Sequence, residues 1–575
     1  MNLLGIHNGN HDAAACLFRD YELVAAVSLE RLTRHKNAGV TADAEMPTAA
    51  IDECLAIGGI SRRDVDVICS THSHWNLQTY RLKGRWRVKQ LWYRLIGTQR
   101  LMPLDKMLRT QQTRNIAAVL APPRILKRYG FDKASINFSY HHMAHAIPAY
   151  FFSEFDDALL YTADGMGDGI SFSARDAGPS EIEHLFGTDE LWDRYTVNSV
   201  GMLYGEFTGA LGFRKNRHEG KVTGLAAYGQ PKAAGDILHH FKVAPNGEIT
   251  SDFSSFRAMG EFAAEVCRPL SREDAAASIQ DALESLICSA IERLVRSTGR
   301  TSVVLGGGVF ANVRLNRAVL ERTGAERVFV FPAMGDEGLP IGCCLIHLLE
   351  RDGMKIWQRQ RYPLQRLYLG RDHSATFAKA AAALPQIMVA TEQPLERAVD
   401  ALTGGQVVAL VTGRMEFGPR ALGARSILAT PVKAEINATI NQRLERSEFM
   451  PFAPVVMAEH ATTIFDIGPG NVHAARFMTI TCDVRPEWRA RIPAVVHVDG
   501  SARPQILREE DNPLCYRVLE LFFRRTGIPV LINTSFNVHE EPIVDTPEQA
   551  LRSLAGGRVD FILTGEGLYW RRDHP

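Results

Sequence analysis

Residues 140–146 have the sequence YHHMAHA, in which His141 and His145 stand four positions apart. In an α-helix, side chains four positions apart lie on one face, one turn above the other. Both imidazoles can therefore reach a single ion. For His142 alone, a packing role is the simpler interpretation.

Two carboxylates follow apolar, strand-like segments further along the chain. Residues 161–169, YTADGMGDG, run from an apolar segment into Asp164 and a glycine-rich turn, and residues 331–338, FPAMGDEG, place Asp336 in a similar loop. Two histidines and two aspartates form a mixed nitrogen and oxygen ligand set that suits divalent iron, manganese or zinc. The glycine turns suit phosphate oxygens held by main-chain N–H groups. The sequence therefore predicts a metal site made by His141, His145, Asp164 and Asp336.

The composition is typical of a globular protein with several domains. A chain of 575 residues is too long for one hydrophobic core, so two to four domains are expected. The hydrophobic content is 46% and the charged content 23%, both ordinary values. Lys and Arg together number 65, as do Asp and Glu, so the net charge argues neither for nor against a polyanionic partner.

The cysteines and the N-terminus predict a cytoplasmic protein. The nine cysteines are an odd number with no CxxC pair, which fits reduced thiols better than a disulfide framework. The first residues, MNLLGIH, lack the basic start and long apolar region of a signal peptide. No apolar run approaches the length of about 18 residues that a transmembrane helix needs.

Strands and helices alternate in the first part of the chain. Residues 2–30 predict strands around a polar turn. Actin-like ATPases begin their phosphate site with such a turn, and an ordinary hairpin has the same pattern. The spacing of apolar residues predicts helices over 47–61 and 272–298. A strand at 302–305 runs into GGGVFAN, residues 306–312, where N–H donors at a helix start favour a nucleotide.

Two further stretches of this part carry positive charge. Residues 81–114 contain ten basic residues against one acid, with aromatic residues between them. Such a stretch can meet nucleic acid, an anionic membrane face or an acidic ligand, while a solvated insertion or lid is the alternative. It is a candidate frame for the entrance of a substrate. Lys221, in the glycine-rich stretch 218–229, is a candidate phosphate ligand or an ordinary surface lysine.

The pattern restarts after a polar, turn-rich segment at 352–370. A helix over 395–403 and a strand over 407–411 lead into the loop 413–426, GRMEFGPRALGARS. Its three arginines, Arg414, Arg420 and Arg425, are suited to gripping phosphate with paired hydrogen bonds. For Arg443 or Arg446 alone, a surface salt bridge is the alternative.

These motifs together resemble the carbamoyltransferase family that includes NodU-type and antibiotic-tailoring O-carbamoyltransferases, and the resemblance covers nearly the whole chain. The motifs in order are HDA at 11–13, HxxxH at 141–145, Asp164, EGK at 219–221, GGGVFAN at 306–312, Asp336, the loop 413–426, PFAP at 451–454, HVDGSAR at 497–503 and NTSFN at 533–537.

The resemblance implies a mixed α/β and α+β protein of two domains. Residues 1–355 are expected to form a TsaD-like domain with the actin-like (ASKHA) ATPase fold, and residues 356–575 a YrdC-like domain. The second domain would combine carbamoyl phosphate with Mg-ATP to give carbamoyl adenylate and pyrophosphate. The first, holding iron(II) or another divalent metal, would transfer the carbamoyl group to a hydroxyl of a small molecule.

The resemblance also implies roles for individual residues. His11 matches the general base of the family, Arg420 joins it as a catalytic residue, and Lys221 contacts phosphate. The adenosine would be bordered by Gly307, Gly308 and Asn312. Phosphates and the carbamoyl group would be held by Arg414, Arg420, Arg425, Arg443, Arg446, Arg503, Asn533 and Ser535.

Two segments depart from the pattern of the family. Many relatives have a lysine before the PFAP motif, whereas residues 443–448 read RLERSE, with Arg443 a possible substitute. Relatives often have a glycine before a Glu-Pro pair after Asn537, whereas residues 538–542 read VHEEP. The turn there is therefore expected to differ.

Other functions share parts of this pattern. A threonylcarbamoyl transferase acting on tRNA would be expected to be more basic, so no nucleic-acid partner is predicted. A hydrogenase-maturation carbamoyltransferase would carry CxxC zinc motifs. An actin-like kinase or a regulatory nucleotide binder without catalysis is a further alternative. The acceptor, which the sequence leaves open, could be a sugar, an aminoglycoside, a polyketide alcohol or a small toxin of secondary metabolism, and the chain could form a homodimer.

Overall fold

The computed structural model describes residues 1–40, 46–71, 124–187, 197–446 and 450–573, with a few positions between 84 and 92. The basic segment 81–114 lies almost entirely outside these residues, so its predicted role at the acceptor entrance stays a prediction. No helix among the described residues is long and apolar enough to cross a membrane.

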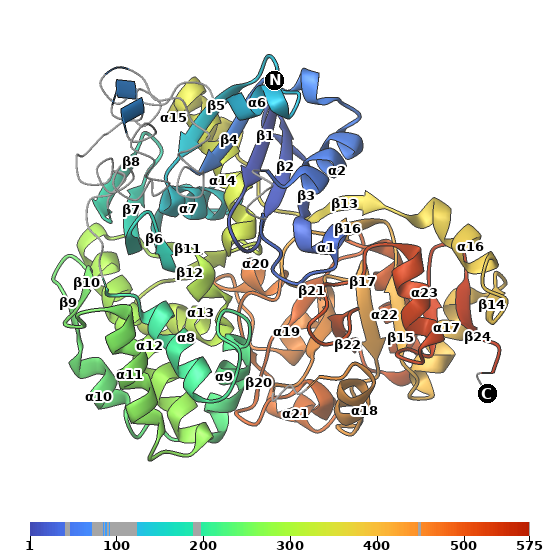
Figure 1. Ribbon diagram of the computed structural model, residues 1–575. Helices are drawn as coiled ribbons and strands as arrows, with labels where there is room; N and C mark the ends of the chain where they lie inside the picture. The colour runs from blue at the N-terminus through green and yellow to red at the C-terminus, as the bar shows by residue number, and fades with distance from the viewer. Residues whose placement is uncertain are drawn as a thin grey trace.

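Two five-stranded sheets with the same topology form the N-terminal half of the protein (Figure 1). In each sheet, three consecutive antiparallel strands are followed on the side of the first strand by two parallel ones. The first sheet contains β1 (Asn2–His7), β2 (Ala14–Arg19), β3 (Glu22–Ser28), β4 (Val67–Thr71) and β5 (Ser135–Ser139). The second contains β6 (Ala158–Gly167), β7 (Ile170–Ala177), β8 (Ile182–Phe186), β11 (Ser302–Gly306) and β12 (Arg327–Val330). This repeat is the predicted actin-like architecture.

Two helices pack between the sheets and share one hydrophobic core with them. Helix α7 (His141–Phe151) contacts β6 and β11, and α14 (Leu339–Asp352) contacts β1 and β4. The helices approach so closely that a Cβ on Gly342 would lie 1.9 Å from the carbonyl oxygen of Ala144. Glycine at this position is what permits the contact.

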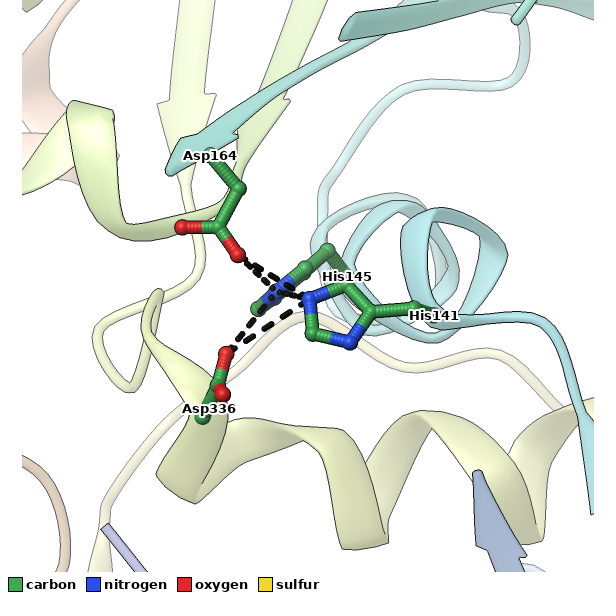
Figure 2. A group of neighbouring side chains, drawn as sticks. All are labelled: His141, His145, Asp164 and Asp336. Carbon is green, nitrogen blue, oxygen red and sulfur yellow. Dashed lines mark hydrogen bonds and ion pairs between the residues drawn. The ribbon is translucent and has the colours of Figure 1, made fainter. Parts of the chain in front are cut away.

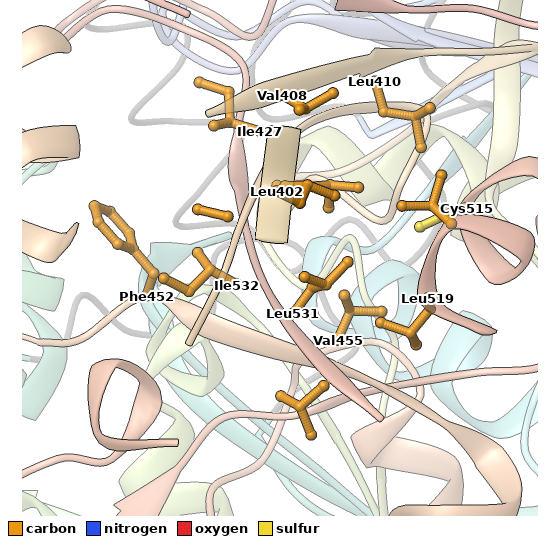
Figure 3. Close-up of a cluster of buried hydrophobic side chains, with 14 of the residues drawn as sticks. Leu402, Val408, Leu410, Ile427, Phe452, Val455, Cys515, Leu519, Leu531 and Ile532 are labelled. Atoms are coloured by element: carbon orange, nitrogen blue, oxygen red, sulfur yellow. The ribbon is translucent and has the colours of Figure 1, made fainter. Parts of the chain in front are cut away.

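An eight-stranded sheet forms the C-terminal half, in the order β14-β24-β23-β15-β17-β22-β18-β21. Its strands are β14 (Ile387–Ala390), β15 (Val408–Val411), β17 (Arg425–Ala429), β18 (Ala453–Met457), β21 (Gln505–Leu507), β22 (Val530–Ser535), β23 (Phe561–Leu563) and β24 (Leu568–Arg571). Figure 3 shows its core, where Leu402 of α17 (Pro394–Thr403) and Leu519 of α22 (Pro513–Thr526) lie near strand residues such as Ile427 and Leu531. This mixed sheet with its helices is the expected YrdC-like part.

Most predicted elements are present with small shifts in their ends. The helix predicted over 272–298 is α12 (Arg272–Thr298), and the one predicted over 47–61 is α2 (Thr48–Gly58). The glycine-rich stretch 218–229 is helical at α9 (Glu219–Leu225), where a Cβ on Gly224 would lie 2.5 Å from Cγ of Met450. Gly224 therefore serves close packing, whereas Gly220 has open space at its Cβ position. The domain division between residues 355 and 356 stays a prediction.

The two halves meet along a long junction. Arg317 of α13 (Val313–Arg322) donates two hydrogen bonds to the Asp483 carboxylate, at 2.8 and 2.7 Å. Arg31 donates to the carbonyl oxygen of Gly418 at 2.8 Å, and a Cβ on Gly418 would lie 3.3 Å from the carbonyl oxygen of Pro332. The loop 413–426 of the C-terminal half therefore lies against the segment that leads to Asp336.

Candidate functional site

Helix α7 presents His141 and His145 from one face, with their Nε2 atoms 3.0 Å apart (Figure 2). The main-chain N–H of His141, at the start of the helix, donates to the Asp168 carboxylate at 2.7 Å. This bond satisfies one of the N–H groups that a helix start leaves unpaired. It also fixes the turn that presents His141. The sequence shows the GDG turn but gives no sign that Asp168 caps the helix.

The two predicted carboxylates face these imidazoles. An oxygen of Asp164, on β6, lies 2.9 Å from Nε2 of His141 and 3.4 Å from Nε2 of His145. An oxygen of Asp336, which precedes α14, lies 3.6 and 3.4 Å from the same two atoms. One ring nitrogen or carboxylate oxygen from each of the four residues lies within 4.8 Å of the others. Figure 2 shows the two carboxylates directed at the two imidazoles. Tertiary structure thus brings together all four residues predicted to bind a metal.

The electrostatics of this group suit a cation. Burial lowers the pKa of His145, but hydrogen bonds to Asp164 and Asp336 outweigh it and raise the pKa to about 9. Burial raises the pKa of Asp164, while hydrogen bonds from His141 and His145 hold it well below its ordinary value. Two buried carboxylates demand nearby positive charge. A divalent ion would supply it with both imidazoles neutral.

Residues around the group hold its four side chains in place. His7, fully buried at the end of β1, has Nε2 3.5 Å from an oxygen of Asp336. A Cβ on Gly167 would lie 2.0 Å from the His141 ring, so only glycine leaves room for that imidazole. His142 lies within hydrogen-bonding distance of the Thr162 hydroxyl, 2.8 Å, and of the Ile170 carbonyl, 3.1 Å. Its contacts agree with the packing interpretation.

The glycine turn after β11 adjoins the four ligands. The N–H of Gly308 donates to the Asp164 carboxylate at 3.3 Å, and the N–H of Gly307 donates to the Met334 carbonyl at 3.0 Å. Gly307 has a φ of 98°, which favours glycine. Asn312 caps α13 and donates to Gln280 at 2.8 Å, so its contacts are within the protein. Lys221 is buried on α9.

His11 lies in the turn between β1 and β2. Its Nδ1 lies 3.1 Å from an oxygen of Asp12, whose other oxygen accepts a hydrogen bond from Asn37 at 2.7 Å. The bond to Asp12, opposed by burial and helped by the charge of Asp336, raises the pKa of His11 to about 9. Asp12 is visible in the sequence beside His11, but its pairing with the ring is a finding of the structure.

Several of the residues predicted to bind phosphate gather around β22 of the C-terminal half. Arg446 donates to the hydroxyls of Thr534, at 2.8 Å, and Ser535, at 3.1 Å, and to the Asn537 side chain at 2.7 Å. Asn533, one strand position before Thr534, is buried and donates to Gln505 at 2.6 Å. We refer to Arg446, Thr534, Ser535 and Asn537 as the Arg446 group.

The arginines of the loop 413–426 have separate positions. The guanidinium of Arg414 donates to the carbonyls of Val24, Leu369 and Gly370, and that of Arg425 to carbonyls that include Thr412 and Ala424. These bonds give both arginines a structural role, and phosphate binding by either stays a prediction. Arg420 is half-buried.

Two other predicted arginines lie apart from the Arg446 group. Arg443 pairs with Asp560 at 2.9 Å, the salt bridge that was the alternative for it. Arg503 is half-buried just after the short strand β20 (Ser501–Ala502). A phosphate contact for either residue stays a prediction.

Sequence reasoning missed the residue that shapes this loop. Glu416 is buried, and its Oε1 accepts hydrogen bonds from the N–H groups of Leu422, Ala424 and Arg425 at 2.8, 3.3 and 3.2 Å. The loop curls around this one carboxylate oxygen. No local pattern in the sequence distinguishes Glu416 from a surface acid.

Comparison with known proteins finds two family models along the chain. One, described as carbamoyltransferase N-terminus, matches residues 2–345, and the other, carbamoyltransferase C-terminus, matches residues 399–571. The nodulation protein NolNO of Sinorhizobium fredii is 32% identical over 98% of this chain and 79% of its own length. Nodulation protein U of the same species is 28% identical over 62% of this chain and 61% of its own. A crystal structure of HypF from T. kodakarensis aligns with a TM-score of 0.35 and 15% identity over 61% of this chain and 48% of its own.

Proposed function

The chain belongs to the carbamoyltransferase family, and from this premise we propose that it is an ATP-dependent O-carbamoyltransferase. Water first hydrolyses carbamoyl phosphate to carbamate and inorganic phosphate. A carbamate oxygen then attacks the α-phosphorus of ATP and displaces pyrophosphate. The oxygen of an acceptor hydroxyl attacks the carbamoyl carbon of the resulting carbamoyl adenylate, and AMP leaves. The products are a carbamoyl ester, AMP, pyrophosphate and phosphate.

The observation that carries this proposal is the buried group of two imidazoles and two carboxylates beside a glycine turn. His141, His145, Asp164 and Asp336 would hold iron(II), manganese or zinc, which suit this ligand set. A bound metal ion would supply positive charge for the phosphate oxygens of the adenylate. The glycine turn 306–308 borders the same place and suits close approach of a nucleotide.

His11 is the proposed base for the acceptor hydroxyl. A base must take the proton of that hydroxyl as its oxygen attacks. Because Nδ1 of the ring pairs with Asp12, Nε2 is the atom that would take this proton. With a pKa of about 9, the ring must first lose its own Nε2 proton, so we expect transfer to the acceptor to become faster as the pH rises toward 9. The pairing also fixes the orientation of the ring.

The Arg446 group and Arg420 are the proposed contacts for the polyanionic substrates of the first step. Carbamoyl phosphate and ATP both carry phosphate, for which guanidinium groups are well suited. Arg446 is held by two hydroxyls and an amide at a strand end, so its position is set before substrate arrives. Preset positioning of this kind lowers the cost of binding.

The acceptor is proposed to be a small molecule with a hydroxyl group, such as a sugar or a natural product. The reaction is proposed to take place in the cytoplasm, which agrees with nine cysteines that form no disulfide.

A product assay without acceptor tests this function. Purified protein is mixed with ATP, magnesium and carbamoyl phosphate, and pyrophosphate and AMP are followed. We expect pyrophosphate release that depends on carbamoyl phosphate and is lost in Arg420→Ala. Release of ADP, or no product from metal-replete protein, would contradict the proposal, and ADP would favour a kinase.

A further inference from the structure

Glu540 has an unusual backbone conformation for its residue type. Its φ is 63°, in the left-handed region that side chains other than Asn, Asp and Gly seldom adopt. A strained backbone of this kind persists where surrounding contacts hold it, and it is often found where a side chain has a task. Glu540 lies in the loop that follows β22, three residues after Asn537 of the Arg446 group.

The contacts of the Glu540 side chain cross the junction between the two halves. One carboxylate oxygen accepts hydrogen bonds from Arg217 at 2.9 Å and from Arg214 at 3.2 Å. The other accepts a hydrogen bond from Nε2 of His218 at 2.9 Å. Arg217 also donates to the carbonyl of Lys36 at 2.9 Å. One carboxylate of the C-terminal half thus gathers three side chains of the N-terminal half.

A second set of bonds supports the same loop. Arg34 of the N-terminal half donates to the carbonyls of Pro542 and Ile543, both at 2.7 Å. Two separate segments of the N-terminal half, around residues 34 and 217, therefore hold the loop 538–543. Hydrogen bonds to charged groups are stronger than neutral ones, so the loop is firmly attached.

His218, His539 and Glu540 have the spacing of a metal site, with ligand atoms within 4.8 Å of one another. The hydrogen bonds of His218 argue against this use. The Nδ1 atom accepts from the N–H of Arg214 at 3.2 Å, so in the neutral ring the proton is on Nε2, which donates to Glu540. A metal would need the Nε2 lone pair and would lie beside two guanidinium groups. The arrangement therefore fits a group of ion pairs across the junction. We refer to Arg214, Arg217, His218 and Glu540 as the ionic clasp.

Both ends of this clasp reach the proposed reaction path. On one side, the Asn537 side chain accepts from Arg446 and donates to the carbonyls of Val538 and Glu541, at 3.0 and 2.7 Å. On the other side, His218 immediately precedes α9, which carries Lys221 and packs on Met450 through Gly224. Movement at Glu540 would thus separate the Arg446 group from α9.

We propose that Glu540, with Arg214, Arg217 and His218, is a positioning residue that keeps the two halves closed while carbamoyl adenylate passes between them. This inference rests on the proposed function. The adenylate hydrolyses in water, so a closed junction preserves it until the acceptor arrives. Glu540 itself contacts no reacting atom.

The test is escape of the adenylate in the absence of acceptor. With ATP, magnesium and carbamoyl phosphate, the native protein should release one pyrophosphate per chain in a burst and then turn over slowly. Glu540→Gly removes the clasp while its backbone remains free to adopt the positive φ, so the variant should fold. After the burst, this variant should release pyrophosphate about tenfold faster than the native protein, in line with loss of a charge-assisted contact. Hydroxylamine added to the filtrate should trap the escaped carbamoyl group as hydroxyurea.

Matched variants separate this role from general damage. Glu392→Gln alters an exposed carboxylate in the loop before α17, away from the loop 538–543, and should behave like the native protein. Arg217→Ala should release pyrophosphate after the burst as fast as Glu540→Gly does. The variant with both substitutions should be no faster than the faster of the two single variants, because both substitutions remove the same contact.

Three outcomes would contradict the proposed role of Glu540. The first is an unchanged slow phase in Glu540→Gly, and the second is additive leakage in the double variant. The third is a second bound metal ion per chain that Glu540→Gly loses. No pyrophosphate from the native protein would instead refute the proposed function itself.

Discussion

At the scale of single residues, the candidate metal site depends on which ring nitrogens of the three histidines on α7 face the two carboxylates. His141 and His145 direct Nε2 toward two carboxylates, while His142, between them in sequence, uses both ring nitrogens within the core. Position on the helix makes this difference, because residues four apart share a face and adjacent residues do not. His7, at the end of β1, contacts Asp336.

The contact of His7 with Asp336 predicts an effect on metal affinity. His7→Ala should weaken binding of the metal about 10–100-fold, since residues that hold a ligand in place contribute on that scale. Competition with a chromogenic chelator would measure it. His460→Ala, in the other half of the chain, is the control and should bind as the native protein does. Equal affinities for all three proteins would show that His7 does not support the site.

The pairing of His11 with Asp12 predicts a shift in titration. Asp12→Asn removes the largest cause of the raised pKa, so the pKa of His11 should fall from about 9 toward its ordinary value of 6.5. Resolved imidazole signals in an NMR pH titration would report it. Asp20→Asn, at another turn of the same sheet, should leave the pKa of His11 unchanged. A pKa that stays near 9 in Asp12→Asn would assign the shift to the metal-site carboxylates.

At the scale of elements, close approach of α7 and α14 places the ligands between the two sheets. The helices touch where a Cβ on Gly342 would meet the carbonyl of Ala144, one residue before His145. Gly306, at the end of β11, likewise lies against the carbonyl of His145, where a Cβ would come within 2.5 Å. The spacing of α7 from its neighbours therefore depends on glycine at both contacts.

These helix contacts predict opposite effects of the same substitution at two helical glycines. Gly342→Ala should lower the free energy of unfolding by about 1–3 kcal/mol, because the added methyl group displaces α7. Gly235→Ala, in α10 (Ala234–His239) with open space around its Cβ position, should raise it by about 0.5–1 kcal/mol. Urea unfolding with stoichiometric metal would measure both. Equal changes in the two variants would contradict the close-packing argument.

At the scale of the whole molecule, charged contacts tie two differently built halves together. Arg317 with Asp483, Arg31 with the Gly418 carbonyl, and Glu540 with Arg217 lie at separate points of the junction. Each joins a segment of the N-terminal half to one more than 100 residues away. The proposed passage of an adenylate between halves depends on these contacts as a set.

The junction predicts a dependence of stability on pH. Burial raises the pKa of Glu540, but hydrogen bonds from His218 and Arg217 outweigh it and lower the pKa from 4.5 to about 2. A carboxylate with a lowered pKa stabilises the folded protein fully above its unfolded value and loses this effect as pH falls through its folded value. The native protein should therefore exceed Glu540→Gln in unfolding free energy by a constant amount from pH 8 to about 5, and by less below about 4.5.

Urea unfolding of the two proteins at a series of pH values would measure this difference, with Glu392→Gln, at an exposed carboxylate before α17, as the reference. A difference that grows as the pH falls from 5 to 3 would contradict the assigned ion pair.

Local patterns were enough to predict many of the elements and the four residues that come together as a candidate metal site. The 27-residue helix α12 follows from apolar spacing, and it ends where predicted because Gly299 adopts φ of 71°. The family resemblance is confirmed by the two family models. Local patterns did not predict the short helix α1 (Leu29–Thr33) after β3, from which buried Arg31 reaches Gly418 in the other half.

The sequence by itself determined the family, many of the helices and strands, and the identity of His141, His145, Asp164 and Asp336 as a group. These follow from residue type and short-range spacing, which one helical turn or one strand end converts into position. Only the tertiary structure decided that Arg425 and Glu416 shape a loop, that His7 lies behind Asp336, and that Glu540 joins the halves. Each of these roles depends on partners distant in sequence or on the direction of a buried side chain, and neither is encoded in local spacing.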